Sequence, residues 1–453
     1  MSLPTLLVHS AHILVAMDGA RREIAGGGLF VRDGVIEQVG LSAELPTTAD
    51  DTLDLAGHIV IPGLVNTHHH LYQNLTRVVP AGQDQQLFGW LKTLYPIWAR
   101  MGPEHIRVSA LVGLAELALS GCTTASDHLY MFPNGARLDD EIDAAHEIGV
   151  RFTATRGSMS IGESAGGLPP DSVVEKPDAI LKDCERIIAR YHDPSAHAML
   201  RIALAPCSPF SVSRELMRDT AAMAARHHVG LHTHLAENAE DIAYSLEKFG
   251  MRPGQYAEEA GWTGEHVWHA HCCVLDDAEI GLFARTGTGI AHCPTSNMRL
   301  GSGIAPVRKM LDRGVTIGLG VDGSASNDCA DLLGEARMAM LLQRAGGNPA
   351  ALTARQALEL ATRGGARVLG RGNEIGQLAP GFAADFAAYP LSTPMMAGTE
   401  WDPVAGLIFC GPQRAAHTVI NGRAVVREGR ITTVDMRKTL ARHADLVRRL
   451  IND

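Results

Sequence analysis

Short apolar runs alternate with segments of helical periodicity through residues 61–364, and each run ends in a polar or ionisable residue. Helical segments such as 104–120 and 214–227 separate the runs. Eight strand–helix units predict an α/β fold, a closed (β/α)8 barrel of the TIM type, whose catalytic groups lie at the C-terminal ends of the strands. The runs are IPGLVNTHHH (61–70), CTTASDHLY (122–130), VRFTATRGS (150–158), LRIALAPCS (200–208), GLHTHLAE (230–237), HVWHAH (266–271), TGIAHCP (288–294) and VTIGLGVDG (315–323).

An open doubly wound sheet is the alternative, but no GxGxxG loop follows the first run. The two ends of the chain differ from its middle, because they consist of short β-type runs separated by turns such as RDG at 32–34 and NG at 421–422. Each end alone is too thin to bury a core. We therefore expect residues 1–60 and 365–453 to form one small β-sandwich domain, with a C-terminal helix over 436–451.

The composition is that of a globular protein, with 453 residues, 46% hydrophobic and 20% charged residues, and a formal net charge of −10. Such a chain lacks the basic field that binds phosphate, so we expect a small-molecule partner and no nucleic-acid polymer. No apolar run approaches the ~20 residues needed to cross a bilayer, and the N-terminus lacks the pattern of a secretory leader. The eight cysteines are scattered without a CxxC pair. These features predict a cytoplasmic protein that binds no membrane.

Three consecutive histidines, His68, His69 and His70, end the first run. Side chains alternate between the faces of a strand, so His68 and His70 point the same way while His69 points the other way. An HxH pair at a strand end offers two ligands to a metal ion, although such histidines also occur as ordinary hydrogen-bonding groups. We expect His69 to orient the loop or to pack behind the site.

Four further runs end in ionisable residues. These residues are His232, His234 and Glu237 in the fifth run, His271 in the sixth, His292 in the seventh and Asp322 in the eighth. Any one of these residues alone is most simply explained as a polar side chain with ordinary hydrogen-bond partners. A convergent set of ionisable groups, however, costs free energy unless an ion or a reaction uses it. Two imidazoles of the first run, one of the fifth and the carboxylate of Asp322 would suit Zn²⁺, with Fe²⁺ as the alternative, better than Mg²⁺. The fourth run has no lysine to bridge a second metal, so we expect one ion, whose water would have a pKa of about 7.

Several motifs together resemble the amidohydrolase superfamily, and within it the mononuclear deaminases. They are PGLVNTHHH, HTHLAE, HAH, HCPTSN, GLGVDG and IGQLAPGFAADF, and the resemblance extends over essentially the whole chain. Longer stretches that cover the expected pocket loops are similar to enzymes that deaminate 8-oxoguanine. These stretches are NTHHHLYQ, LFGWLKTLYPIWAR, TRGSMSIGESAGGLPP and LAPCSPFSV.

The resemblance implies a role for each matching residue. The metal ligands are then His68, His70, His234 and Asp322. Glu237 would shuttle protons between the attacking water and a ring nitrogen, His271 would hydrogen-bond the attacking hydroxide, and Asp322 would take its proton. Gln73 would donate to and accept from the purine edge at the same time. Barrels of this family often self-associate, so a homo-oligomer is also implied.

The implied reaction is metal-dependent hydrolytic deamination of 8-oxoguanine to urate and ammonia, by attack of hydroxide at C2. No carboxylate for a ribose stands near the segment PIWARM, which favours a free base over a nucleoside. Cys207 is small enough to leave room for an 8-oxo group, with a packed thiol as the alternative. Guanine, isoxanthopterin and an amino-triazine are alternative substrates, and a non-catalytic ligand-binding protein is the alternative of another class. Weaker candidates for substrate contacts are Trp90, Tyr130, Arg156 and Ser158.

Overall fold

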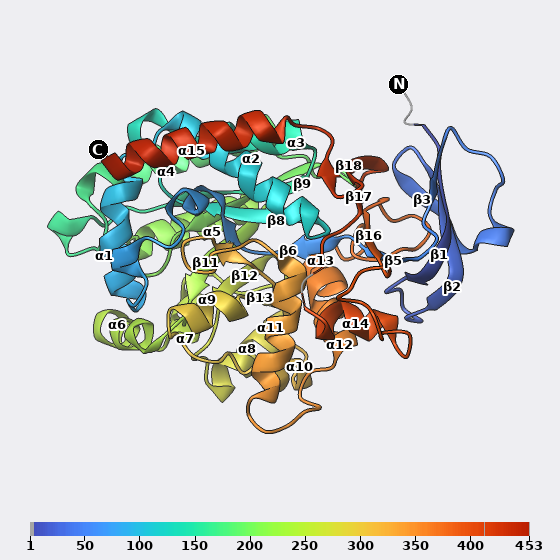
Figure 1. The fold of residues 1–453 in the computed structure, drawn as a ribbon. Coiled ribbons are helices and arrows are strands. Elements are labelled where there is room, and N and C mark those ends of the chain that lie inside the picture. Colours follow the sequence, from blue (N-terminus) through green and yellow to red (C-terminus); the bar gives the residue numbers. More distant parts are fainter. Residues whose placement is uncertain (1–3, 412, 453) are drawn as a thin grey trace.

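The structure is a computed structural model that describes residues 4–411 and 413–452. Eight parallel strands close into a barrel in the order β10, β11, β12, β13, β14, β6, β8, β9, which confirms the predicted fold class (Figure 1). Each strand lies within one of the eight apolar runs. The strands are β6 (Leu64–Asn66), β8 (Cys122–Leu129), β9 (Arg151–Ser158), β10 (Leu200–Pro206), β11 (Gly230–Leu235), β12 (Val267–His271), β13 (Gly289–His292) and β14 (Thr316–Leu319).

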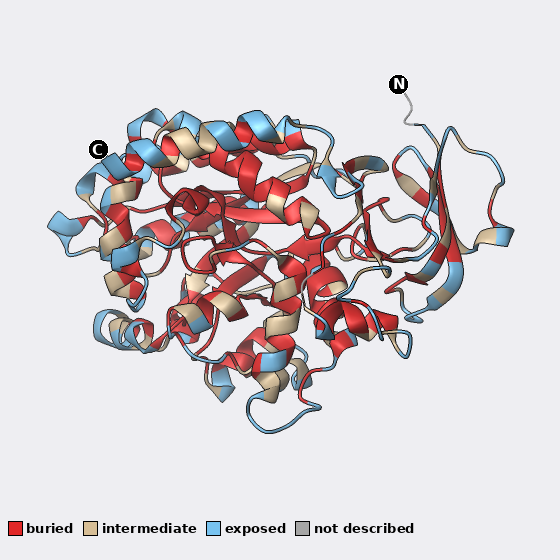
Figure 2. Ribbon diagram, in the orientation of Figure 1, coloured by how far each residue is buried: buried red, intermediate tan, exposed pale blue. Residues whose placement is uncertain are grey.

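Helices cover the outside of the barrel, with their inner faces buried and their outer faces exposed (Figure 2). Side chains cap several of them; the Ser213 hydroxyl, for example, accepts from the amide of Leu216 at the start of α5. Over the described parts of the chain, no helix has both the length and the apolar character needed to span a bilayer. The helices are α1 (Leu87–Trp98), α2 (Pro103–Leu119), α3 (Leu138–Ile148), α4 (Pro177–Tyr191), α5 (Arg214–His227), α6 (Ala239–Phe249), α7 (Pro253–Glu259), α8 (Asp277–Thr286), α9 (Pro294–Arg299), α10 (Val307–Asp312), α11 (Leu332–Arg344), α12 (Ala354–Glu359) and α13 (Gly365–Val368).

Strands from both ends of the chain form the small β domain. Hydrogen bonds join them into one nine-stranded mixed sheet in the order β19, β18, β17, β16, β5, β1, β2, β3, with β4 paired to β1. Its core contains the buried side chains of Leu14, Leu29, Phe386 and Val419, which come from both termini. The strands are β1 (Leu6–Val15), β2 (Glu23–Arg32), β3 (Val35–Leu41), β4 (Asp51–Asp54), β5 (His58–Pro62), β16 (Phe386–Pro390), β17 (His417–Ile420), β18 (Arg423–Arg427) and β19 (Arg430–Ile431).

The small domain joins the barrel directly. Gly63 alone separates β5 from β6, and a Cβ at this position would lie 2.0 Å from Oγ1 of Thr123, so only glycine fits the close approach. Arg151 at the start of β9 forms a buried two-pronged ion pair with Asp385, with N–O distances of 2.8 and 2.9 Å. The two domains therefore share a buried polar contact as well as a covalent connection.

The last part of the chain is divided between the two domains. Helix α15 (Met436–Asn452) agrees with the predicted C-terminal helix, but it packs along α2 of the barrel, away from the sheet (Figure 1). Its buried residues, Leu446 and Leu450 among them, form the apolar stripe of an amphipathic helix. Helix α13 also contacts the barrel strand β14, and α14 (Pro403–Phe409) contacts α11 and α12. The exact domain boundaries stay a prediction.

Candidate metal and catalytic site

A short parallel ladder extends the barrel beyond the C-terminal ends of β6 and β14. Strand β7 (His69–His70) pairs with β15 (Asp322–Gly323), so that Asp322 lies beside His69 and Gly323 beside His70. The ladder fixes the carboxylate of the eighth run against the histidines of the first. It explains why residues more than two hundred positions apart meet at one end of the barrel.

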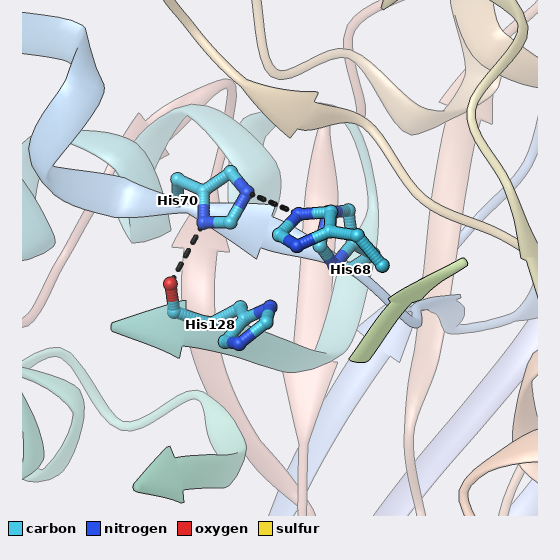
Figure 3. A group of neighbouring side chains, drawn as sticks. His68, His70 and His128 are labelled. Carbon is cyan, nitrogen blue, oxygen red and sulfur yellow. Dashed lines mark hydrogen bonds between the residues drawn. The ribbon is translucent and has the colours of Figure 1, made fainter. Parts of the chain in front are cut away.

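Hydrogen bonds fix the tautomers of three histidines at this end of the barrel, His68, His70 and His234. Nδ1 of His70 lies 2.7 Å from the carbonyl of His128 (Figure 3), and Nδ1 of His234 lies 2.6 Å from the carbonyl of Cys207. A carbonyl only accepts, so each Nδ1 carries the proton and each Nε2 carries a lone pair. His68 is held in the same way by His232, whose Nδ1 donates to a carbonyl and whose Nε2 accepts from Nδ1 of His68 at 2.7 Å.

These lone pairs point at one place. Oδ1 of Asp322 lies 3.2 Å from Nε2 of His68 and 3.4 Å from Nε2 of His70. Nε2 of His70 and Nε2 of His234 are 3.1 Å apart with no proton to share, and Nε2 of His68 is buried without a hydrogen-bond partner. Such an arrangement is repulsive unless a cation lies between the groups, and the donor set of three imidazoles and one carboxylate fits a divalent transition metal.

The protonation states agree with metal binding. Burial lowers the pKa of His68, His70 and His234, that of His234 to about 3, so all three are neutral near pH 7. Burial would raise the pKa of Asp322, but its interactions with the surrounding imidazoles, that of His68 first, outweigh burial and hold this pKa well below its usual value. The site therefore offers neutral nitrogens and an ionised oxygen.

The four candidate ligands His68, His70, His234 and Asp322 are called the metal group below. Glu237 and His271 lie next to it. Oε2 of Glu237 is 3.5 Å from Nε2 of His271, which in turn is 3.9 Å from Oδ2 of Asp322. Burial raises the pKa of Glu237 to about 7, and Ser302 donates to its Oε1. Burial would lower the pKa of His271, but the charges of Glu237 and Asp322 outweigh it and raise the pKa. A carboxyl group poised near pH 7 beside a metal site is suited to proton transfer.

Two residues at these strand ends have a strained backbone. His271 and Asp322 adopt φ values of 71° and 61°, in the left-handed region that residues other than glycine rarely occupy. Each such residue costs on the order of 1 kcal/mol or more and persists only where surrounding structure holds it. Here Asn297 holds His271 by accepting from its Nδ1 at 2.9 Å, and Ser326 donates to Asp322.

A small cavity adjoins the metal group and lies under helix α1. Trp90 of α1 is held against the turn that follows β15, because its Nε1 donates to the carbonyl of Ala325 at 3.2 Å. The walls are largely aromatic and aliphatic, and no lysine or arginine stands among the described residues that line the cavity. The lining residues are His70, Gln73, Leu87, Trp90, Leu91, Tyr95, Tyr130, Cys207, Phe210, His234, Glu237, His271, Leu300, Asp322 and Ser326.

Four of the predicted substrate contacts, Gln73, Cys207, Trp90 and Tyr130, line this cavity. Burial raises the pKa of Cys207 to about 12, so it is present as a thiol. Oε1 of Gln73 is buried and has no hydrogen-bond partner.

Arg156 and Ser158 do not line the cavity. The Arg156 guanidinium is engaged by two carboxylates, Glu175 and Asp183, at 2.8 Å each, so its charge is neutralised behind the wall of β9. The carbonyl of Ser158 accepts from the amide of Cys207, which gives this residue a role in the barrel ladder.

Two other histidines of the pattern lie apart from the metal group. Both ring nitrogens of His292 are buried without a partner, and it does not belong to the convergent cluster predicted for the strand ends. His69 points away from the site, as the strand period predicts, and its Nδ1 accepts from the amide of His70. A Cβ on Gly113 of α2 would lie 3.7 Å from Nε2 of His69, which places this ring behind the site against α2.

His128 was missed by the sequence analysis. Its ligand atom and those of His68, His70 and His234 lie within 4.8 Å of one another, and its ring stacks on that of His234 at 4.8 Å. Nε2 of His128 lies 2.8 Å from the carbonyl of Ala205. Its place at the end of the second run is the same signal that identified the other histidines.

Comparisons with known proteins agree with this site. The model of the amidohydrolase family matches residues 59–425. The chain is 47% identical over 422 residues to 8-oxoguanine deaminase from Pseudomonas aeruginosa, covering 92% of this chain and 94% of the relative. It is 37% identical to an isoxanthopterin deaminase from an unknown prokaryotic organism, with 99% and 98% covered. The solved structure of atrazine chlorohydrolase from Arthrobacter aurescens TC1 complexed with zinc superposes with a TM-score of 0.92 at 35% identity, covering 98% of this chain and all of that one.

The matched span includes the whole barrel together with β5, β16 and β17 of the small domain, and the resemblance drawn from the motifs is confirmed. The metal group and the poised Glu237 and His271 lie at the barrel end where this fold carries its chemistry. The chain belongs to the amidohydrolase family and is a hydrolase that acts on C–N bonds.

Proposed function

We propose that the protein deaminates 8-oxoguanine to urate and ammonia. The observation that carries this proposal is the position of Glu237, a buried carboxyl group with a pKa of about 7, between the metal group and an aromatic cavity. Deamination of a ring amidine needs a proton donor at this place, because the ring nitrogen becomes basic as water adds to the neighbouring carbon. The 47% identity to an 8-oxoguanine deaminase supports the choice of base.

We further propose a single Zn²⁺ held by His68, His70, His234 and Asp322, with Fe²⁺ as the alternative. The fixed tautomers and the lone pairs that face one another support this ligand set. When bound, such an ion supplies a nucleophile at neutral pH by lowering the pKa of a water molecule to about 7.

Each neighbouring residue then has a separate task. Protonated Glu237 donates to the ring nitrogen beside C2, and His271 orients the attacking oxygen from its place 3.5 Å away from the same carboxyl group. Asp322 takes one proton of the attacking water and passes it on to the amine, which leaves as ammonia, and Glu237 takes the other proton of that water and is thereby protonated again. Water adds to C2, the C2–N bond breaks, and urate remains.

The cavity supports a flat, uncharged base as the substrate. Trp90, Tyr95, Tyr130 and Phe210 supply aromatic surface, and the lining carries no lysine or arginine that would hold a phosphate, as far as the described residues go. The buried carbonyl oxygen of Gln73 lacks a hydrogen-bond partner, so we propose that Gln73 hydrogen-bonds to the edge of the purine. An unpaired buried amide oxygen is unfavourable until a ligand donates to it.

The test is ammonia release by the zinc-loaded protein from 8-oxoguanine, guanine, isoxanthopterin and an amino-triazine. We expect kcat/KM to be at least about tenfold higher for 8-oxoguanine, which corresponds to about 1.4 kcal/mol of transition-state binding. A higher value for any other base would replace the proposed substrate. Absence of turnover on every base, in protein that holds stoichiometric zinc, would favour a non-catalytic ligand-binding protein.

A further inference from the structure

Gly323 lies directly beneath the amide group of Gln73. A Cβ placed on Gly323 would lie 1.8 Å from Oε1 of Gln73, 2.3 Å from its Cδ and 2.9 Å from its Nε2. All three distances are shorter than real Cβ contacts, so the amide group packs against the backbone of β15 with its oxygen nearest to Gly323. A residue with any side chain at position 323 would occupy the place where this amide now lies.

The backbone itself does not require glycine at this position. Gly323 is absent from the residues with positive φ, so an L-amino acid could adopt its conformation without strain. The strand ladder is also intact here, with Gly323 beside His70 in the β15–β7 pair. The close approach of Gln73 is therefore the physical reason for a glycine at this place.

The position of the amide group matters for binding. Gln73 belongs to the short 3-10 helix Leu71–Thr76 that follows the metal histidines, and its side chain lines the cavity with Oε1 unpartnered. If the amide group were displaced from Gly323, it would move into the cavity and occupy space needed by the substrate.

We propose that Gly323 is a positioning residue for substrate recognition. It acts through Gln73, because the absence of a side chain lets the amide group lie back against the strand and leaves one donor and one acceptor facing the cavity. The ligand recognised in this way is a flat heterocycle with an adjacent acceptor and donor on one edge. The identity of that heterocycle rests on the function proposed above, whereas the contact between the two residues does not.

The experiment is a double-mutant cycle with Gly323→Ala, Gln73→Ala and the double variant, each loaded with zinc. We expect Gly323→Ala to raise KM for 8-oxoguanine about tenfold or more while kcat changes less, since the lost interaction is made with bound substrate throughout. In the Gln73→Ala background the same substitution should add little, because the group it displaces is gone. Gly346→Ala is the matched control, as this exposed glycine has an ordinary φ and only Gln343 O at 3.8 Å.

Thermal unfolding and zinc content provide readouts that do not depend on activity. The double variant should unfold at a higher temperature than Gly323→Ala, because removal of the Gln73 side chain relieves the collision. Losses that simply add in both KM and melting temperature, or loss of zinc from Gly323→Ala alone, would overturn the proposal by indicating that Gly323 acts on Asp322. If wild type prefers another base of the panel, the proposed function fails, and the cycle is read with that base.

Discussion

His443 on the C-terminal helix and Asn74 beside the metal histidines are joined by a hydrogen bond of 2.8 Å between Nε2 and Oδ1. Asn74 uses its Nδ2 to donate to the carbonyl of Ser109 on α2, so its Oδ1 is the acceptor and His443 is the donor. Burial lowers the pKa of His443 to about 4, which leaves the ring neutral. Helix α15 therefore holds the segment that carries Gln73, although 369 positions separate His443 from Asn74.

Replacing His443 with Ala should loosen this segment. We expect a loss of about 1 kcal/mol of unfolding free energy from the hydrogen bond, together with a fall of severalfold in kcat/KM and unchanged zinc content. Faster amide exchange in residues 71–76 is the direct measurement. His12→Ala, at an exposed position of β1, is the control and should change neither quantity. Unchanged exchange in His443→Ala would contradict the role given to α15.

Glu237→Gln keeps the size of the side chain and removes its proton. Turnover should fall by about 10²–10⁴-fold, the usual contribution of a positioned acid. Zinc content should stay at the wild-type level, because Glu237 is not one of the proposed ligands. The exposed neighbour Glu240 offers a matched control in Glu240→Gln, which should keep full activity. Full activity in Glu237→Gln would remove Glu237 from the mechanism.

The raised pKa of Glu237 also has a consequence for stability. Burial moves it from 4.5 to about 7, so between these pH values the folded protein keeps a proton that the unfolded chain has released. Stability must therefore fall as pH rises through this window, by roughly 3 kcal/mol for this group. Urea unfolding of wild type and Glu237→Gln at pH 5 and pH 8 should show a smaller pH effect in the variant. Equal pH effects would contradict the raised pKa.

His232 sets the tautomer of His68 without belonging to the proposed ligand set. His232→Leu should weaken zinc binding about 10–100-fold, as is usual when the hydrogen-bond partner of a ligand is lost. His292→Leu is the comparison, because this histidine is equally buried in the barrel but makes no hydrogen bond through its ring. Competition with a chelator measures both affinities. Wild-type zinc affinity in His232→Leu would show that His68 can bind zinc without its hydrogen bond to His232.

The ion pair between Arg151 and Asp385 joins the barrel to the small domain. Asp385→Ala leaves the Arg151 charge buried and should cost about 3–5 kcal/mol of unfolding free energy. Glu37→Ala breaks the more exposed pair with Arg32 and should cost less than about 1 kcal/mol. Urea unfolding distinguishes the two, and equal costs would contradict a structural role for the buried pair.

Local periodicity determined much of this protein. The alternation of apolar runs and helical segments identified all eight barrel strands, and the two-residue period of a strand placed His68 and His70 on one face with His69 on the other. These features depend only on neighbours in the chain, which is why they can be predicted from the sequence. The motif resemblance added the family and the expected acid, Glu237.

Partners that lie far apart in the chain were decided only by the tertiary structure. Arg156 looked like a substrate contact from its strand end, but its charge is taken up by Glu175 and Asp183 of neighbouring elements. The support of His68 by His232 and of Asn74 by His443 depends on strand register and on where α15 packs, which no local pattern records. The physical reason is that one side chain's environment is built from several distant segments, so it is fixed only when the barrel closes.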